Sequence, residues 1–274
     1  MNAPIARIYR GRERIAALDP ADRGLVYGDG LFTTIRVHAG QPVWWDAHCA
    51  RLATGGARLG LAVPGADWLR TEVDALLAGQ GGDGVLKLVL TRGAGGRGYQ
   101  ARGDLPPTLV MSRHPLPPSP GAPLVLRWCQ LRMALQPALA GIKHLNRLEQ
   151  VLARAEWADD SIHEGLLLDS AGRVACATAA NVFARIDGRW LTPEVAECGV
   201  AGVARAWVLA HAPDAAEATL RPADLEAADA LFLCNAVRGI LPVGRLGEQS
   251  WAPHPALAEL QRQLGRAEPA FEGS

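Results

Sequence analysis

The pattern of apolar and polar residues predicts strands and amphipathic helices in the first half of the chain. β-Branched and aromatic residues cluster over 7–11, 31–45 and 85–93, as is typical of strands. Apolar residues recur at helical spacing over 48–61 and 66–79, which predicts two helices that each pack by one face. These elements indicate an α+β lobe whose strands meander.

The second half of the chain repeats this mixture with shorter elements. The pattern predicts strands over 165–174, 181–190 and 230–237, and helices near 146–158, 202–211 and 257–264. In the first of these helices, an apolar face is expected from residues that follow the 3.6-residue period: Leu145, Leu148, Leu152 and Ala155.

A proline-rich stretch separates the two halves. Residues 114–123 read HPLPPSPGAP and lie between the strand-like runs 108–112 and 123–128. A chain of 274 residues is long enough to bury two cores. We therefore expect an N-terminal α+β lobe over 1–115, a linker over 116–123 and a C-terminal lobe over 124–274.

The charges of the chain balance. The 28 basic and 28 acidic side chains cancel, and no run of like charges forms a tail or a polyanion-binding strip. Nucleic acid is therefore not an expected partner. The N-terminal residues lack the apolar core of a signal peptide, and no window reaches the ~18 apolar residues of a membrane span. We expect a soluble, cytoplasmic protein with no membrane partner.

The cysteines favour neither a disulfide framework nor a zinc site. They are odd in number, widely spaced and never arranged as CxxC. We expect reduced thiols that serve mainly in packing: Cys49, Cys129, Cys176, Cys198 and Cys234.

One lysine stands where a catalytic amine could act. Lys143 follows the apolar, flexible Ala-Gly-Ile, and His144 and Arg147 lie one and four residues further on. A lysine forms a Schiff base with a carbonyl when burial or a neighbouring cation keeps its amine deprotonated. The spacing alone also allows a solvated lysine at the start of a helix.

Two segments could bind an anion such as phosphate. Gly199 to Gly202 precede a predicted helix, whose free N–H groups and dipole favour negative charge. Arg51, in HCARL, lies near the start of another helix and could form a forked contact to phosphate. An ordinary turn and an arginine lying along the surface are the alternatives.

Several motifs, taken in order, resemble fold type IV pyridoxal-phosphate enzymes, and among these the aminodeoxychorismate lyases most closely. They are RGLVYGDGLFTTIRV (23–37), HCARL (48–52), LKLVLTRGAGGRGY (86–99), AGIKHLNRLEQVL (140–152), LLLDSAGRV (166–174) with AANVF (179–183), GVAGVAR (199–205) and CNAVRGILPV (234–243). HxxRL and GVxGxxR belong to the wider class IV aminotransferase superfamily, whereas YGDGLFTT, RGAGGRGY and GIKHLNRLEQVL are specific to the lyases.

The resemblance implies a fold, an activity and partners. The fold would be α+β and similar to D-amino-acid and branched-chain aminotransferases, with two lobes, the cofactor pyridoxal 5'-phosphate between them, and Lys143 in the C-terminal lobe. The activity would be a carbon-oxygen lyase that converts 4-amino-4-deoxychorismate to 4-aminobenzoate and pyruvate in folate biosynthesis. The protein would be a homodimer. A D-amino-acid or branched-chain type transaminase and a non-catalytic paralogue are the alternatives.

The resemblance also implies the site residues. Lys143 would carry the Schiff base and act as base and acid, so no metal and no Ser-His-Asp triad is needed. The remaining cofactor-binding residues would be Arg51, Cys176, Val200, Ala201, Asn235, Ala236 and Val237. The substrate-binding residues would be Phe32 and Thr34, which strand alternation places on one face, and Arg92, Arg97 and Tyr99 in the glycine-rich loop.

Cys176 departs from the family, in which a glutamate usually pairs with the pyridinium nitrogen of the cofactor. A thiol does not stabilise a protonated ring as a carboxylate does. The cofactor should therefore be a weaker electron sink, on which transamination depends more than an elimination that is pulled by aromatisation. The substitution favours the lyase over the transaminase, although it would also be compatible with an inactive paralogue.

Overall fold

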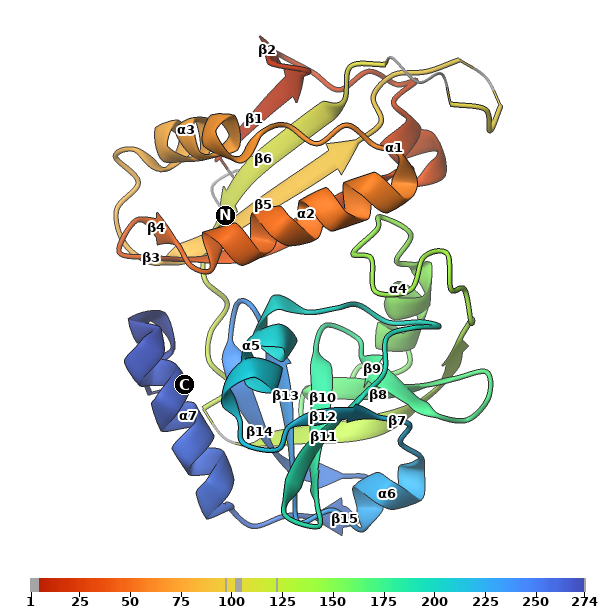
Figure 1. Ribbon diagram of the computed structural model, residues 1–274, viewed down its shortest axis with the longest axis vertical. Helices are drawn as coiled ribbons and strands as arrows, with labels where there is room; N and C mark the ends of the chain where they lie inside the picture. The colour runs from red at the N-terminus through yellow and green to blue at the C-terminus, as the bar shows by residue number, and fades with distance from the viewer. Residues whose placement is uncertain (1–4, 97, 102–104, 122, 274) are drawn as a thin grey trace. The chain divides into compact units, whose positions relative to one another are not determined.

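The computed structural model describes residues 5–96, 98–101, 105–121 and 123–273, which form two compact units (Figure 1). Unit 1 comprises Met1–Pro117 and Ile142–Asn146, and unit 2 comprises Pro118–Gly141 and Arg147–Ser274. The boundary at Pro117 falls inside the predicted linker. The assignment of Lys143 to the C-terminal lobe needs correction, because the segment that carries it packs with unit 1.

Unit 1 is built on a six-stranded sheet in the order β2-β1-β6-β5-β3-β4. All its neighbouring strands are antiparallel. The strands are β1 (Ile5–Arg10), β2 (Glu13–Ile15), β3 (Gly30–His38), β4 (Gln41–Pro42), β5 (Gly84–Thr91) and β6 (Thr108–His114). The longest register, between β3 and β5, pairs Gly30 with Thr91 and Val37 with Gly84. The meander expected from the alternating pattern is therefore present.

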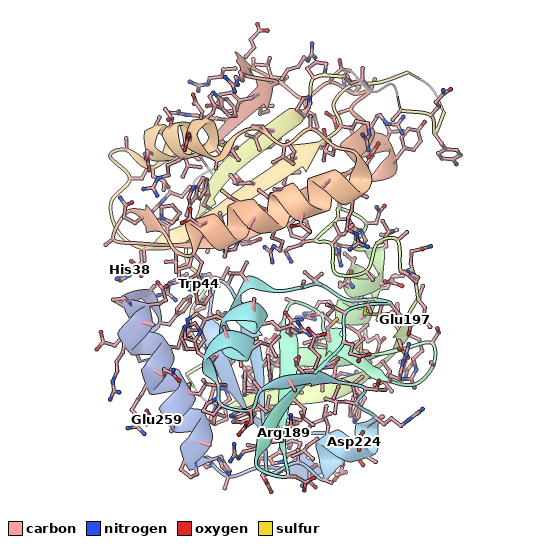
Figure 2. All side chains as sticks on the ribbon, in the orientation of Figure 1. His38, Trp44, Arg189, Glu197, Asp224 and Glu259 are labelled. Carbon is pink, nitrogen blue, oxygen red and sulfur yellow. The ribbon has the colours of Figure 1, made fainter. Side chains whose placement is uncertain are left out.

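Two helices pack on one face of this sheet, α2 (Trp45–Leu59) and α3 (Ala66–Leu77) (Figure 1). Leu52 of α2 and Leu69 of α3 enter the same core as Ile35 of β3. Trp44, labelled in Figure 2, adopts a positive φ of 54° immediately before α2 and turns the chain from the sheet into the helix. A shorter helix, α1 (Arg23–Tyr27), precedes β3.

Unit 2 contains a nine-stranded mixed sheet in the order β12-β11-β10-β13-β14-β7-β8-β9, with β15 paired to β14. Strand β7 runs parallel to both β8 and β14. The strands are β7 (Leu124–Met133), β8 (Glu164–Asp169), β9 (Val174–Ala177), β10 (Asn181–Ile186), β11 (Arg189–Pro193), β12 (Ala216–Ala218), β13 (Ala230–Asn235), β14 (Gly239–Leu246) and β15 (Gln249–Ser250).

The helices of unit 2 are α4 (Leu148–Arg154), α5 (Val203–His211), α6 (Pro222–Glu226) and α7 (Pro255–Ala267), followed by the 3-10 turn η1 (Pro269–Phe271). The packing of the sheet includes a stacked pair of buried rings, Phe183 and Phe232, whose centroids are 4.9 Å apart. Among the described residues, no helix is long and apolar enough to cross a membrane.

Helix α4 differs from its prediction. It begins at Leu148, and most of the expected apolar face is exposed: Leu148 by 74%, Leu152 by 59% and also Ala155, whereas Leu145 is half-buried. Val151, which was not assigned to that face, is exposed by 60%. The residues that anchor this region in the core are Ala153 and Trp157. The 3.6-residue period correctly predicted a helix here. Periodicity does not show, however, whether the apolar face of a helix packs on the core of its own chain.

Candidate active site

Strand β3 sorts its side chains between two faces. Leu31, Thr33 and Ile35 are buried under α2, while Phe32 and Thr34 are half-buried on the opposite face. This is the alternation expected of a strand with one face on a core. It confirms that Phe32 and Thr34 share a face.

The segment that carries Lys143 lies along the start of β3. The Phe32 amide donates to the Lys143 carbonyl at 3.0 Å, and the Leu145 amide donates to the Gly30 carbonyl at 3.0 Å. These bonds hold the backbone on both sides of the lysine. The Lys143 Nζ atom lies over the Phe32 ring, 4.4 Å from its centroid, at a distance where a ring attracts an ammonium group.

Both lysines of the chain use the same aromatic ring. Lys87, which pairs with Thr34 across β3 and β5, has its Nζ atom 5.5 Å from the Phe32 centroid. Lys143 is half-buried and Lys87 is exposed. The Nζ atoms of both lysines therefore lie near the Phe32 ring, and that of Lys143 is the closer.

On the other face of β3, the half-buried Arg51 joins two buried polar side chains in a cluster. The Arg51 Nη2 atom donates to Thr33 Oγ1 at 2.7 Å, and Thr33 Oγ1 lies 2.6 Å from His48 Nδ1. Burial lowers the pKa of Arg51 to about 10. Burial, together with the charges of Arg51 and Lys143, holds the pKa of His48 well below its usual value, so the imidazole is neutral at physiological pH. We call Thr33, His48 and Arg51 the Thr33 cluster.

In unit 2, the glycine-rich turn leads directly into α5. Gly202 is the N-cap, and a side chain at this position would collide with the Asn181 carboxamide. Asn181 Nδ2 in turn donates to the Val200 carbonyl at 3.0 Å. The amide of Gly141, two positions before Lys143, donates to the Gly199 carbonyl at 3.1 Å. The turn is thus packed closely by its neighbours.

The amides of this turn differ in availability. The Ala201 amide donates to the Gly141 carbonyl at 3.0 Å, so it already has an acceptor. The amides of Val203 and Ala204 lie in the first turn of α5, where no intrahelical acceptor exists. They are the better anion donors, and the predictions for Val200 and Ala201 stay predictions. The sequence could have identified these two amides only if it had fixed the exact residue at which the helix starts.

Asn235 closes the second predicted phosphate loop on itself. Its Oδ1 atom accepts from the Val237 amide at 3.0 Å and from the Arg238 amide at 2.9 Å. The side chain thus shapes the loop 235–238 after β13. The Val237 amide is therefore already bonded to Asn235. The predicted phosphate contacts of Ala236 and Val237 stay predictions.

Cys176 lies in a hydrophobic cluster of unit 2. Its thiol is 7% exposed, and its Sγ atom is 3.6 Å from the sulfur of Met133. The same cluster contains Leu167, Cys129 and Trp157, and the charge of Arg147 interacts with Cys176. A thiol in this setting packs and donates weakly, so its predicted role next to a cofactor ring stays a prediction.

The glycine-rich loop of unit 1 differs from the expectation. Arg92 donates to both carboxylate oxygens of Asp29, at 2.8 and 3.1 Å, and to the carbonyls of Leu59 and Gly60. These bonds occupy four of its five N–H groups, so Arg92 holds the loop in place, and its role in substrate binding stays a prediction. Tyr99 is 89% exposed, and Arg97 lies outside the described residues.

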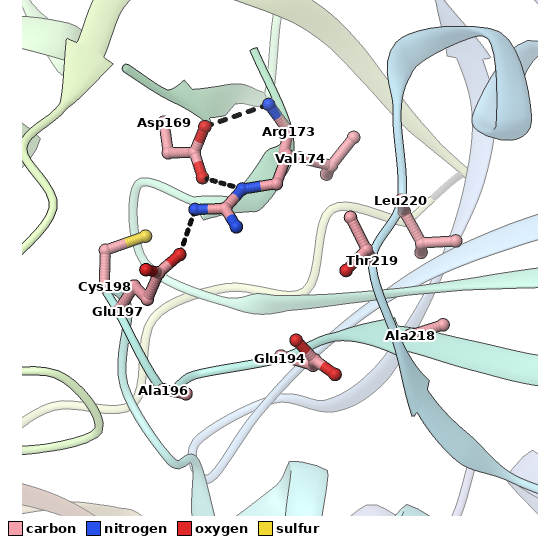
Figure 3. Close-up of a pocket in the computed structure, with 10 residues that line it drawn as sticks. All are labelled: Asp169, Arg173, Val174, Glu194, Ala196, Glu197, Cys198, Ala218, Thr219 and Leu220. Atoms are coloured by element: carbon pink, nitrogen blue, oxygen red, sulfur yellow. Dashed lines mark hydrogen bonds and ion pairs between the residues drawn. The ribbon is translucent and has the colours of Figure 1, made fainter. Parts of the chain in front are cut away.

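A small pocket of unit 2 is lined by none of the predicted site residues (Figure 3). Arg173 spans it by binding Asp169 at 2.6 Å and also Glu197. In the described ranges, this pocket included, no group of three or more histidine, cysteine or acidic side chains could hold a metal ion.

Comparison with known proteins places this geometry in context. The model of the amino-transferase class IV family matches residues 30–246. The chain is 36% identical over 260 residues to an aminodeoxychorismate lyase of Vibrio harveyi, covering 89% of this chain and 92% of the relative. It is 29% identical over 239 residues to a putative branched-chain-amino-acid aminotransferase of Methanocaldococcus jannaschii, covering 84% and 83%. The crystal structure of 4-amino-4-deoxychorismate lyase from Pseudomonas aeruginosa superposes with a TM-score of 0.90 at 41% identity, covering 96% of this chain and 99% of that one.

Proposed function

The chain belongs to the class IV aminotransferase family, and on this basis we propose that it is a pyridoxal-phosphate-dependent lyase that converts 4-amino-4-deoxychorismate to 4-aminobenzoate and pyruvate. The observation that carries the chemistry is the position of Lys143, whose amine is held over the Phe32 ring. Preference for the lyase over a transaminase rests on the two lyase relatives, which are more similar to the chain than the aminotransferase relative.

The residues present fit the cofactor. Pyridoxal phosphate has an aldehyde, for which Lys143 is the amine, and a phosphate, which needs donors and positive charge. Arg51 supplies both, because its Nε atom is buried without a hydrogen-bond partner in the described part of the chain. We propose Arg51 as a phosphate ligand, and Val200, Ala201, Asn235, Ala236, Val237 and Cys176 stay predictions.

The reaction then needs few groups from the protein. When bound, the cofactor supplies an electron-accepting ring conjugated to the substrate amine. The Lys143 amine removes the proton from C4 of the substrate. The C3–O bond breaks, and the same amine returns the proton to the methylene carbon of the departing enolpyruvyl group. The atoms of the substrate are then shared between 4-aminobenzoate and pyruvate, so no co-reactant is required.

We also propose that the protein is a homodimer, as the family resemblance implies. The exposed apolar residues of α4 are spaced i, i+3 and i+4, so they form one stripe that a single copy leaves in water. A second copy of the chain is the occupant that we assign to this stripe. The expected cytoplasmic location stays a prediction.

A product assay tests the lyase proposal. Incubation with aminodeoxychorismate should yield 4-aminobenzoate and pyruvate in equal amounts, because each turnover produces one of each. Amino transfer to a keto acid from D-alanine or a branched-chain amino acid, without the aromatic product, would instead identify a transaminase. A protein that shows neither reaction and binds no cofactor would be a non-catalytic relative.

Lys143→Ala is the decisive variant. If this amine is both tether and base, its loss should lower turnover by more than the ~10²–10⁴-fold typical of one acid–base group. Borohydride reduction should attach cofactor mass to the peptide that contains Lys143 in the wild type. Lys87→Arg is the matched control, because Lys87 is the other lysine of the chain. Loss of the cofactor label in Lys87→Arg, or wild-type turnover in Lys143→Ala, would contradict the proposal.

A further inference from the structure

Arg51 is a half-buried cation whose hydrogen bonds within the protein are to neutral groups. Its hydrogen bonds go to Thr33 and to His48, and in the described ranges it forms no ion pair with a carboxylate. Leaving a buried charge without an opposite charge is costly unless hydrogen bonds hold it in place. The two neutral partners therefore hold the guanidinium and leave its charge for a ligand.

The positions of the hydrogens in the Thr33 cluster follow from its donors. Arg51 has only donors, so Thr33 Oγ1 must accept from Nη2. His48 Nδ1 faces both the Thr33 hydroxyl, at 2.6 Å, and Arg51 Nη2, at 3.4 Å. Arg51 Nη2 can only donate, so its contact favours a lone pair on Nδ1. The Thr33 hydroxyl then donates to Nδ1, and the imidazole proton is on Nε2, a buried atom with no hydrogen-bond partner in the described residues.

This arrangement makes each link depend on the next. The lone pair on His48 fixes the direction of the Thr33 hydroxyl, which in turn presents an oxygen lone pair to Arg51 Nη2. His48 and Thr33 are themselves buried, at 1% and 0% exposure, so water does not replace a lost link. With Nη2 held, Nε and its neighbouring N–H groups keep one orientation.

We propose that Thr33 and His48 are positioning residues that orient the Arg51 guanidinium toward the phosphate of the cofactor. This inference rests on the proposed function, because it assumes that Arg51 binds that phosphate. Thr33 and His48 do not touch the phosphate; they act through Arg51. The sequence pattern did not identify Thr33 as a site residue, because its side chain lies on the opposite face of β3 from Phe32 and Thr34.

The test measures cofactor binding by the protein freed of cofactor, titrated with pyridoxal phosphate and, separately, with pyridoxal. Thr33→Val keeps the shape but removes the hydroxyl, and it should raise the dissociation constant for pyridoxal phosphate about tenfold, the effect of one lost hydrogen bond to a charged group. Affinity for pyridoxal, which lacks the phosphate, should be unchanged. Thr33→Ser, which restores the hydroxyl, should bind pyridoxal phosphate nearly as the wild type does.

A double-mutant cycle separates positioning from general damage. In an Arg51→Ala background, Thr33→Val should cause no further loss of affinity, because the residue through which it acts has gone. Thr71→Val is the matched control, since the Thr71 hydroxyl donates to a carbonyl on the exposed face of its own helix, α3. A Thr33→Val effect of the same size in both backgrounds, or on pyridoxal as well, would overturn the inference.

The His48 variants keep the test decisive if Thr33→Val does not fold. His48→Asn retains an acceptor near the Thr33 hydroxyl and should preserve affinity, whereas His48→Leu lacks one and should lose about tenfold. Equal affinities of these two variants would also overturn the inference. An Arg51→Ala variant that binds pyridoxal phosphate normally would contradict instead the proposed role of Arg51 itself.

Discussion

Asp29 is the carboxylate that organises the glycine-rich loop of unit 1. It accepts from Arg92 at 2.8 Å and from Arg23 Nε at 2.9 Å, and Arg23 also donates to the carbonyls of Gly98 and Tyr99. Burial raises the pKa of Asp29, but the hydrogen bonds and charges of the two arginines outweigh it, and the pKa is lowered overall. The ionised carboxylate therefore stabilises the fold.

We predict that Arg92→Gln lowers the free energy of unfolding at pH 7 by about 2 kcal/mol, because it removes a half-buried charged contact to Asp29 and two contacts to carbonyls. The wild type should lose this stabilisation as the pH falls from the ordinary Asp pKa of 3.8 through the lower pKa of the folded state. The difference between the two proteins should therefore shrink in acid.

Urea unfolding at pH 7 and near pH 3 measures this effect. Arg70→Gln is the control, since Arg70 pairs with Asp74 on an exposed helix surface and its loss should cost less than about 0.5 kcal/mol. If Arg92→Gln were as stable as the control and failed only in the product assay, Arg92 would be a substrate residue after all.

These residues show which site features a sequence can predict. Phe32 and Thr34 could be placed together because strand alternation is a local property. The partners of Arg92 lie 63 residues away at Asp29 and 32 residues away at Gly60, so no local pattern identified them. His48 and Arg51 share a helix face, but their link to Thr33 depends on how α2 packs on β3.

At the scale of elements, the long periodic segments were predicted and the short ones were not. Helix α3 and strands β5 and β6 lie where the pattern placed them. The strand predicted over 31–45 ends earlier, at His38 in β3, because the short β4 and the start of α2 at Trp45 take up the rest. Helices α1 and α6, of five residues each, and the two-residue strand β15 are too short to produce a period. Tertiary contacts determine such elements, so they appear only in the folded chain.

The exposed stripe of α4 gives a prediction at this scale. Leu152→Glu places a charge in the stripe and should convert a dimer into a monomer, because a buried carboxylate without a partner opposes association. Light scattering or sedimentation measures the mass directly. Glu226→Gln, on the distant short helix α6, is the control that should leave the mass unchanged. A Leu152→Glu protein that remains dimeric would show that another surface holds the two copies.

For the molecule as a whole, the division into two units was predictable, but their exact membership was not. The prolines of 114–123 mark the boundary in the sequence. The return of Ile142–Asn146 to unit 1 has no such mark, because it depends on backbone hydrogen bonds between Lys143 and Phe32 and between Leu145 and Gly30. The residue with the clearest chemistry thus belongs to the segment that local composition assigned to the other lobe.

The cofactor should stabilise the whole fold through this segment. A ligand that binds only the native state at about 100 times its dissociation constant adds about 2.7 kcal/mol. For a chain of this size we expect pyridoxal phosphate to raise the melting temperature by about 5–10 °C, at about 2–4 °C per kcal/mol.

Differential scanning calorimetry with and without pyridoxal phosphate checks this shift. Lys143→Ala should show a smaller shift at the same cofactor concentration, because it loses the covalent attachment but keeps the phosphate contacts of Arg51. Arg51→Ala should also show a smaller shift, and excess cofactor should restore it, since a higher concentration offsets a weaker dissociation constant. Excess cofactor should therefore restore the shift of Arg51→Ala but not that of Lys143→Ala, because it compensates for lost affinity but does not replace the missing amine. This difference separates the covalent attachment from the phosphate contact. Equal shifts in the wild type and Lys143→Ala would show that attachment at Lys143 contributes nothing to stability.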